Sequence, residues 1–262
     1  MDSQTLSTRL DGLGLGAVRF YVQTSSTNEV AMMWLGQGAP DGALVAADEQ
    51  TAGRGRFARR WVTRPGAALA MSLILRPTPA ETEKLGLFSA LGALGVADAL
   101  ETLYGLTPQI KWPNDVLLDS HKVCGILVES SWNGVHLDGM VIGIGVNVSP
   151  EAVPPAEELA FPATSVESVL GKPAERWQIL REMLARMLSW RSRIGSPEFF
   201  SAWDRRLAFR GEWVRIVSGY AGQADREGRI VGLNPDGSLR LSDREGGEFS
   251  VDIGDVHLRP SA

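Results

Sequence analysis

The sequence predicts an α+β protein in which a mixed β-sheet flanked by helices covers residues 1–210 and a small β-barrel covers residues 211–262. Two observations carry this prediction. Apolar runs of strand length alternate with helical patterns as far as Ile194, and four short strands separated by Gly, Asp and Asn turns begin at Trp213. The C-terminal stretch, at about fifty residues, has the size of a minimal domain.

Composition narrows the class of protein. The 262 residues carry a formal net charge of −5 and include a single cysteine, Cys124. One thiol cannot form an internal disulfide, so we expect a reducing, cytoplasmic environment. The acidic balance argues against direct nucleic-acid binding, and the lack of a targeting segment or of about 18 uninterrupted apolar residues argues against a membrane location. The three histidines lie far apart, which makes a zinc site unexpected.

The N-terminal elements follow from local patterns. Residues 1–16 are polar and glycine-rich without a sustained period, and they are too few for an independent domain. Alternating apolar residues predict a strand at 17–23, and Ser26 with Glu29 three positions later predicts a capping box for a helix that ends at Gly36. Apolar runs predict strands at 43–49 and 69–76.

The middle of the chain is read in the same way. Thr78 with Glu81 predicts the start of a helix that runs to Tyr104. Strands are predicted to end at Trp112, to begin at Val116, and to cover 123–129 and 135–148.

The remaining elements complete the chain. Residues 151–162 are proline-rich and acidic, which predicts a surface connection. An amphipathic pattern predicts a helix at 174–194, and N-P-D-G at 234–237 predicts a tight turn in the barrel.

The segment 49–61 is the most distinctive stretch of the chain. It places four arginines and two glycines between two predicted strands. Arginines bind phosphoryl oxygens bidentately, and glycines let backbone amides approach phosphate. A solvated charged loop is the alternative interpretation of this segment taken alone.

Other charged residues extend the candidate site. Lys111, Lys122, Asp115 and Glu129 stand at predicted strand ends and turns, where ligands commonly bind. The simplest interpretations are that Asp115 bonds its own turn and that Lys122 is a solvated surface lysine. Alternatively, Asp115 helps to hold Mg²⁺. No nucleophile–base arrangement and no Walker A motif is apparent, so the residues alone indicate a phosphate-handling enzyme that works by positioning and charge neutralisation.

Five motifs together resemble those of the biotin protein ligases, which are biotin–acetyl-CoA-carboxylase ligases. The motifs are S-T-N at 26–28, G-R-G-R-x-x-R-x-W at 53–61, K-W-P-N-D at 111–115, K-x-x-G-I-L at 122–127 and G-x-G-x-N at 143–147. They occur in that family's order and approximate spacing, and the resemblance extends over nearly the whole chain. It implies a class II synthetase-like catalytic domain and an SH3-like C-terminal domain. Residues 1–16 are too few for the winged helix of the DNA-binding members, which implies the monofunctional type.

The resemblance also implies a reaction and a partner. Biotin and Mg-ATP form biotinyl-5'-AMP, and biotin then passes to a lysine of a biotin carboxyl carrier protein. The alternative is a lipoate-protein ligase or octanoyl transferase of the same fold, although those relatives have a different arginine–glycine pattern in the 53–61 segment. A binding module on a degenerate scaffold is a further alternative of a different class. Exposed sheet edges make a homodimer compatible with the sequence.

The resemblance assigns roles to particular residues. Residues matched to the biotin pocket are Ser26, Thr27, Asn28, Gln50, Gly53, Arg54, Gly55, Arg56, Lys122 and Gly125. Residues matched to ATP or the adenylate are Arg56, Arg59, Trp61, Lys111, Asn114, Asp115, Gly143 and Asn147. Lys122 and Arg56 are the expected catalytic residues, Trp61 is expected to pack on adenine, and Asp115 is the expected Mg²⁺ ligand. The 53–61 segment is expected to be mobile until the adenylate forms.

Overall fold

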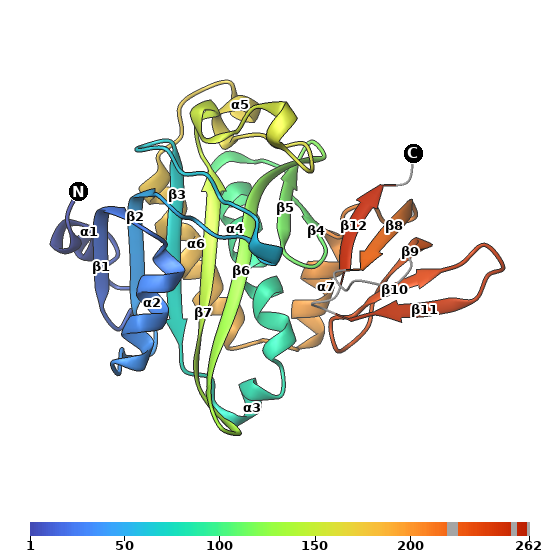
Figure 1. The fold of residues 1–262 in the computed structure, drawn as a ribbon, viewed down its shortest axis with the longest axis horizontal. Coiled ribbons are helices and arrows are strands. Elements are labelled where there is room, and N and C mark those ends of the chain that lie inside the picture. Colours follow the sequence, from blue (N-terminus) through green and yellow to red (C-terminus); the bar gives the residue numbers. More distant parts are fainter. Residues whose placement is uncertain (219–224, 253–255, 261–262) are drawn as a thin grey trace.

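A seven-stranded mixed sheet forms the centre of the molecule (Figure 1). The computed structural model describes residues 1–218, 225–252 and 256–260. The strand order is β1-β2-β3-β7-β6-β5-β4, in which β1 and β2 are parallel and the other neighbours are antiparallel. The strands are β1 (Val18–Thr24), β2 (Leu44–Gln50), β3 (Ala68–Leu75), β4 (Gln109–Lys111), β5 (Asp115–Leu118), β6 (His121–Asn133) and β7 (His136–Asn147). The predicted mixed sheet with flanking helices is confirmed.

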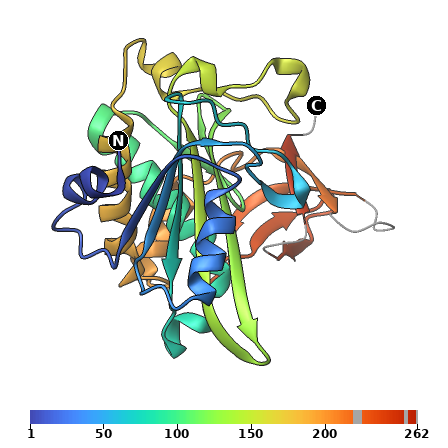
Figure 2. The ribbon, with the colours of Figure 1, turned by 60° about the vertical axis from the view of Figure 1, so that its left-hand side comes forward.

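Helices cover the two faces of the sheet unequally. The long helices α4 (Phe88–Tyr104) and α6 (Arg176–Arg191) pack on one face, and α2 (Thr27–Gly36) lies on the other (Figures 1 and 2). Strand alternation explains this arrangement. On β6 and β7, Ile126 and Ile142 point toward Gly92 of α4, whereas the odd-numbered residues face the side of α2.

One helical stretch, Leu85–Tyr104, is long and apolar enough by composition to cross a membrane. Its most apolar window is 72% buried inside the protein, and α4 packs against α6 and the sheet. The stretch is therefore placed as a core helix.

The predicted helix from Thr78 to Tyr104 is interrupted. The Thr78–Glu81 capping box is present, but the first helix is only α3 (Pro79–Thr82), and a 3-10 turn, η2 (Leu85–Leu87), precedes α4. Glu81 also bonds Arg191 of α6 at 2.7 Å, so the short helix is attached to a distant element that the local pattern does not reveal.

The predicted capping box of α2 is wrong, and a short helix precedes β1. Ser26 occupies the N-cap position of α2 but makes no capping hydrogen bond, and Glu29 instead accepts from the hydroxyl of Ser25 at 2.5 Å. Within residues 1–16 the chain forms α1 (Ser3–Arg9), because Asp2 caps the helix and two apolar side chains, Leu6 and Leu10, are buried against the core.

The C-terminal unit is an antiparallel sheet of five strands, where four were predicted. Its order is β11-β10-β9-β8-β12, consistent with a small barrel. The strands are β8 (Trp213–Ser218), β9 (Arg226–Leu233), β10 (Leu239–Ser242), β11 (Glu248–Val251) and β12 (Val256–Pro260). The additional strand is β12, which pairs with β8 at the end of the chain. The predicted tight turn is confirmed, since the Gly237 amide donates to the Asn234 carbonyl at 2.9 Å.

The C-terminal sheet is joined closely to the central sheet. Helix α7 (Pro197–Arg205) leads into residues 206–208, where the Ala208 amide donates to the carbonyl of Ile110 in β4. The buried indole N–H of Trp112 donates to the Gly237 carbonyl of the barrel turn at 3.1 Å. Apolar side chains of both sheets belong to one continuous core.

Candidate active site

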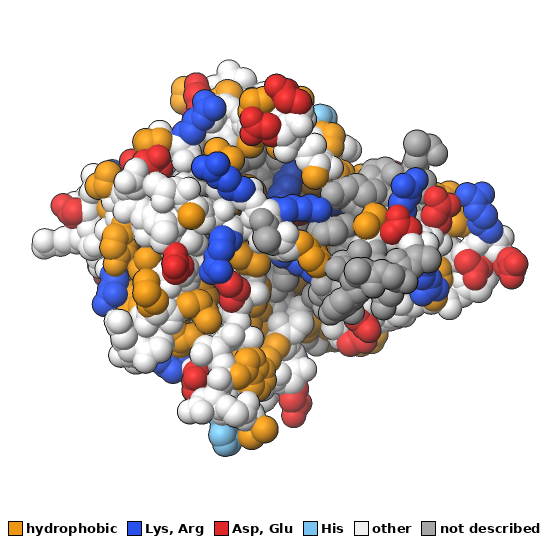
Figure 3. All heavy atoms as spheres, viewed as in Figure 1, with side chains coloured by type: hydrophobic (Ala, Val, Ile, Leu, Met, Phe, Trp, Pro, Cys, Tyr) orange, Lys and Arg blue, Asp and Glu red, His pale blue; other side chains and the backbone are white. Residues whose placement is uncertain are grey.

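A pocket of about 400 Å³ opens over the sheet face that carries α2. Its walls come from the start of α2, the end of β2, the segment after it, the β4–β5 turn, β6, β7 and residues 152–163. Lys and Arg side chains gather around its opening (Figure 3). Every site residue predicted from the sequence lines this pocket except Gly53 and Glu129. The fold therefore brings five motifs that are distant in sequence into one cavity.

The segment between β2 and β3 forms a compact turn over the pocket. The Gly55 amide donates to the Arg59 carbonyl at 2.7 Å, and the Trp61 amide donates to the Gly53 carbonyl at 2.9 Å. A Cβ atom on Gly53 would clash with the Trp61 carbonyl oxygen, so this glycine shapes the turn without lining the pocket. Phe57 at the tip adopts a left-handed φ of 57°.

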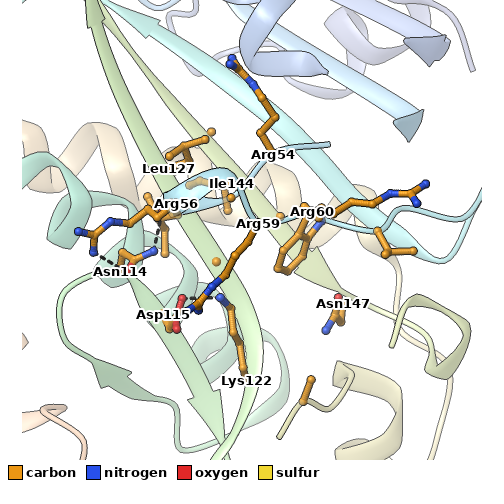
Figure 4. Close-up of a pocket in the computed structure, with 18 of the residues that line it drawn as sticks. Arg54, Arg56, Arg59, Arg60, Asn114, Asp115, Lys122, Leu127, Ile144 and Asn147 are labelled. Carbon is orange, nitrogen blue, oxygen red and sulfur yellow. Dashed lines mark hydrogen bonds and ion pairs between the residues drawn. The ribbon is translucent and has the colours of Figure 1, made fainter. Parts of the chain in front are cut away.

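The arginines of this segment point in different directions (Figure 4). Arg56 donates to the side-chain oxygen of Asn114 at 3.2 Å, and Arg54 pairs with Glu129 at 3.2 Å. The Arg59 side chain is directed toward Asp115 and Lys122, whereas Arg60 points away from them (Figure 4). Arg59 thus brings positive charge to one end of the pocket, and the ion pair of Arg54 with Glu129 attaches the turn to β6 at the other end.

A buried carboxylate holds two lysines at that positive end. Asp115 Oδ1 lies 2.6 Å from Lys122 Nζ, and Asp115 Oδ2 lies 3.2 Å from Lys111 Nζ. The residues meet because Lys111 and Asp115 are directly opposite on β4 and β5, and Lys122 is the second residue of β6, which pairs with β5. Burial by itself would raise the pKa of Asp115, but the charges of Lys122 and Lys111 outweigh it and lower the pKa to about 2. Asp115 is therefore ionised at neutral pH, and the three groups together carry a net positive charge.

This geometry overturns the simplest interpretations of two residues. Asp115 is the first residue of β5 and bonds lysines from two other strands, so it is not merely a residue bonding its own turn. Lys122 is only 26% exposed at its side chain and is ion-paired, so it is not a solvated surface lysine. Both roles depend on strand pairing, which a local pattern cannot show.

The opposite end of the pocket is a neutral hydrogen-bond network. The side-chain oxygen of Gln50 accepts from the Thr27 amide at 2.8 Å and from the Thr27 hydroxyl at 3.0 Å. Ser72, a buried residue of β3 that the sequence did not single out, bonds Thr27 Oγ1 at 2.8 Å and Asn28 Oδ1 at 2.6 Å. Asn28 Nδ2 donates to Glu129 at 2.7 Å. These contacts fix the orientation of the side chains relative to one another.

Glycines of β6 and β7 make room for the side chains above them. A Cβ atom on Gly143 would clash with Asn28 Oδ1, and a Cβ atom on Gly145 would clash with the indole of Trp61. Gly125 lies beneath the same indole. Gly143, assigned to the nucleotide from the sequence, thus contacts a residue assigned to biotin, and it is Gly145 that lies below Trp61.

Residues 152–163 form a wall of the pocket that the sequence did not reveal. They were predicted to be only a surface connection, yet Leu159 and Phe161 line the cavity. The Lys111 ammonium lies 4.5 Å from the centre of the Phe161 ring, a cation–π contact. The segment is attached to β6 because the Lys122 amide donates to the Pro162 carbonyl at 2.8 Å. A lone aromatic residue in an acidic, proline-rich stretch was the available signal.

Comparison with known proteins now identifies the family. The model of the biotin/lipoate A/B protein ligase family matches residues 20–147. A biotin–acetyl-CoA-carboxylase ligase of Mycobacterium tuberculosis is 33% identical over 268 aligned positions, which span 99% of this chain and 96% of that protein. The chain belongs to the biotin/lipoate A/B protein ligase family.

Other members of the biotin/lipoate ligase family are similar in sequence or structure. The bifunctional ligase/repressor of Bacillus subtilis is 38% identical over 160 residues, but the match spans only 61% of this chain and 49% of that protein. A solved biotin protein ligase from Aquifex aeolicus in complex with biotin and ATP superimposes with a TM-score of 0.79 at 29% identity, covering 93% of this chain and 99% of that chain. The expected fold class and family are thereby confirmed.

The surroundings of Asp115 show whether this residue can act as the expected Mg²⁺ ligand. Among the described residues there is no group of three or more His, Cys, Asp or Glu side chains suited to a metal ion. Both carboxylate oxygens of Asp115 already face ammonium groups. A Mg²⁺ ligand role would require Asp115 to give up one lysine, so these residues do not fit a metal ion held by the protein itself.

Proposed function

We propose that this chain is a biotin protein ligase that activates biotin with ATP to biotinyl-5'-AMP and transfers biotin to a lysine of a biotin carboxyl carrier protein. One observation carries the proposal: a cationic cluster suited to phosphate and a neutral hydrogen-bond network suited to a polar ring lie at opposite ends of one pocket. The names of the relatives support the same activity.

The first step requires two anions to meet. A biotin carboxylate oxygen attacks the α-phosphorus of ATP, a P–O bond forms, and the bond to pyrophosphate breaks. Lys122 and Lys111 supply fixed positive charge that Asp115 keeps in place, and Arg59 is directed to the same point. Such pre-positioned charge lowers the repulsion between the reactants and stabilises the charge that develops in the transition state.

The second step needs little from the protein beyond orientation. The neutral ε-amine of the carrier lysine attacks the biotinyl carbonyl, an amide forms as the nitrogen loses one proton to solvent, and AMP leaves with its phosphate still beside the cationic cluster. We assign Lys122 and Arg56 to the reacting carboxylate and phosphate. Arg56 is suited to this role because Asn114 orients its guanidinium at 3.2 Å.

The competing acid is lipoate. Its dithiolane ring has no N–H or C=O groups, so it could not bond the polar atoms that Thr27, Gln50 and Asn28 present to the pocket. A site built to hydrogen-bond a substrate rejects an analogue that lacks those groups. The polar network therefore favours biotin.

Pyrophosphate exchange into ATP tests the proposal directly. The purified protein is assayed with biotin, with lipoate and with neither acid. We expect exchange that depends on biotin, followed by biotin transfer to a carrier-domain lysine. Exchange that responds to lipoate but not to biotin, or to neither acid, would exclude the proposed activity.

Three further expectations belong to the same proposal. The carrier domain of a biotin-dependent carboxylase is the proposed partner, in line with the names of the relatives. Magnesium-bound ATP is the proposed form of the nucleotide, with the ion carried on the phosphates. A cytoplasmic location, suggested by the single cysteine, and homodimer formation remain predictions.

A further inference from the structure

The amide of Asn28 is held on both sides, and two of its partners, Ser72 and Glu129, lie outside the sequence motifs. Its nitrogen donates to the Glu129 carboxylate at 2.7 Å and to the Leu127 carbonyl at 3.3 Å. Its oxygen accepts from the Ser72 hydroxyl at 2.6 Å. Asn28 itself is buried and lines the pocket, whereas Glu129 does not line it.

Strand register explains how these contacts arise. Ser72 of β3, Gly143 of β7 and Leu127 of β6 are direct neighbours across three adjacent strands. Because Gly143 has no side chain, the Asn28 amide lies across this row and reaches both outer strands. Glu129 is two residues after Leu127 on the same face of β6.

Chemistry then allows only one orientation of the amide. An ionised carboxylate and a backbone carbonyl are both acceptors, so the NH₂ group must face Glu129 and Leu127. The flipped amide would place its oxygen against the carboxylate and leave its NH₂ group facing Ser72. With both N–H bonds used in this way, Asn28 can offer the pocket only a lone pair on its oxygen.

We propose that Glu129 is a positioning residue that orients Asn28 as a hydrogen-bond acceptor and thereby selects a substrate ring that carries N–H donors, such as a cyclic urea. This inference rests on the proposed function, because biotin has such a ring and lipoate does not. Glu129 acts through Asn28 and does not need to touch the substrate.

The same carboxylate oxygen also accepts from Arg54 of the 53–61 turn at 3.2 Å. Glu129 therefore has two separable roles, as an acceptor for Asn28 and as a charge partner for Arg54. Glu129→Ala removes both. Glu129→Gln keeps an acceptor oxygen of the same reach and removes only the charge, so the two variants distinguish the roles.

Biotin-dependent pyrophosphate exchange measures the effect. For Glu129→Ala we expect the biotin KM to rise about tenfold. A tenfold change corresponds to about 1.4 kcal/mol, which is typical of the loss of one hydrogen-bond partner. The ATP KM and the rate at saturating biotin stay within about twofold, since the cationic end is untouched. Desthiobiotin, which keeps the cyclic urea and lacks the sulfur ring, shows the same shift. Glu129→Gln stays within about threefold of the parent protein.

A matched control and two contrary results complete the test. Glu248→Ala is the control, because it breaks the Arg240–Glu248 ion pair of the C-terminal sheet, outside the pocket. We expect it to leave the biotin KM, the ATP KM and the rate at saturating biotin unchanged. An unchanged biotin KM in Glu129→Ala overturns the inference. An equal loss in Glu129→Gln also overturns it, because the charge on Arg54 would then be responsible. Absence of biotin-dependent exchange in the parent protein would instead reject the proposed function.

Discussion

Replacing Asp115 by asparagine tests the cluster that organises the cationic end of the pocket. The change preserves shape but removes the carboxylate charge that lies within 3.2 Å of the ammonium groups of both Lys111 and Lys122. Lowering the Asp115 pKa from 3.8 to about 2 corresponds to about 2 kcal/mol of native-state stability. The amide also leaves two partly buried ammonium groups without this partner, so we expect a total loss of about 2–4 kcal/mol at pH 7.

The pH dependence has a definite sign. Because the pKa is lower in the folded protein, the stabilisation by Asp115 is fully present above the unfolded value of 3.8 and is lost as the pH falls toward about 2. The free energies of unfolding of the parent and of Asp115→Asn should therefore differ at pH 7 and converge below about pH 4.

Urea denaturation of both proteins between pH 7 and pH 3 measures this difference, and pyrophosphate exchange measures its effect on activity. We expect exchange to fall by about 100-fold, the usual effect of misplacing charge that stabilises a transition state. If the parent and Asp115→Asn had equal free energies of unfolding at pH 7, or if the difference between them stayed constant down to pH 3, Asp115 would not be the charge that holds the two lysines.

Other changes test other parts of the pocket. Lys122→Ala should remove pyrophosphate exchange while circular dichroism still reports a folded protein; unchanged exchange would exclude Lys122 from catalysis. Gly145→Ala places a methyl group against the Trp61 indole, so we expect the free energy of unfolding in urea to fall by about 1–3 kcal/mol and the ATP KM to rise. A free energy of unfolding and an ATP KM equal to those of the parent would mean that Trp61 can move aside at no energetic cost. Residues 53–61 should be cleaved more slowly by trypsin when biotin and ATP are both present, and equal cleavage rates would argue against ordering over the adenylate.

Much of the fold could be predicted because its signals are local. The strands at β1, β2, β3 and β7 follow from apolar runs, and Gly105 ends α4 in a left-handed conformation as its position suggested. Errors arose where a side chain bonds a partner that the motif does not name. Glu29 bonds Ser25, and Glu81 bonds Arg191 of a helix about a hundred residues later.

The candidate site was predicted as a set of residues and not as an arrangement. The motifs named most of the residues that line the pocket, but not the wall formed by residues 152–163. They did not show that Asp115 would hold two lysines, that Ser72 and Glu129 would support Asn28, or that Phe161 would stand beside Lys111. Those relations depend on strand register and on a loop that returns to β6, and no local pattern encodes either.

The hydrogen bond between the Trp112 indole and the Gly237 carbonyl has a consequence for the cooperativity of unfolding. Trp112 stands between the active-site residues Lys111 and Asn114, and its indole is fully buried against the turn of the C-terminal sheet. The central sheet and the C-terminal sheet therefore share one continuous hydrophobic core. Loosening the C-terminal sheet would expose the indole and release the backbone that carries the phosphate-binding lysine, so folding cooperativity links the small sheet to the catalytic pocket.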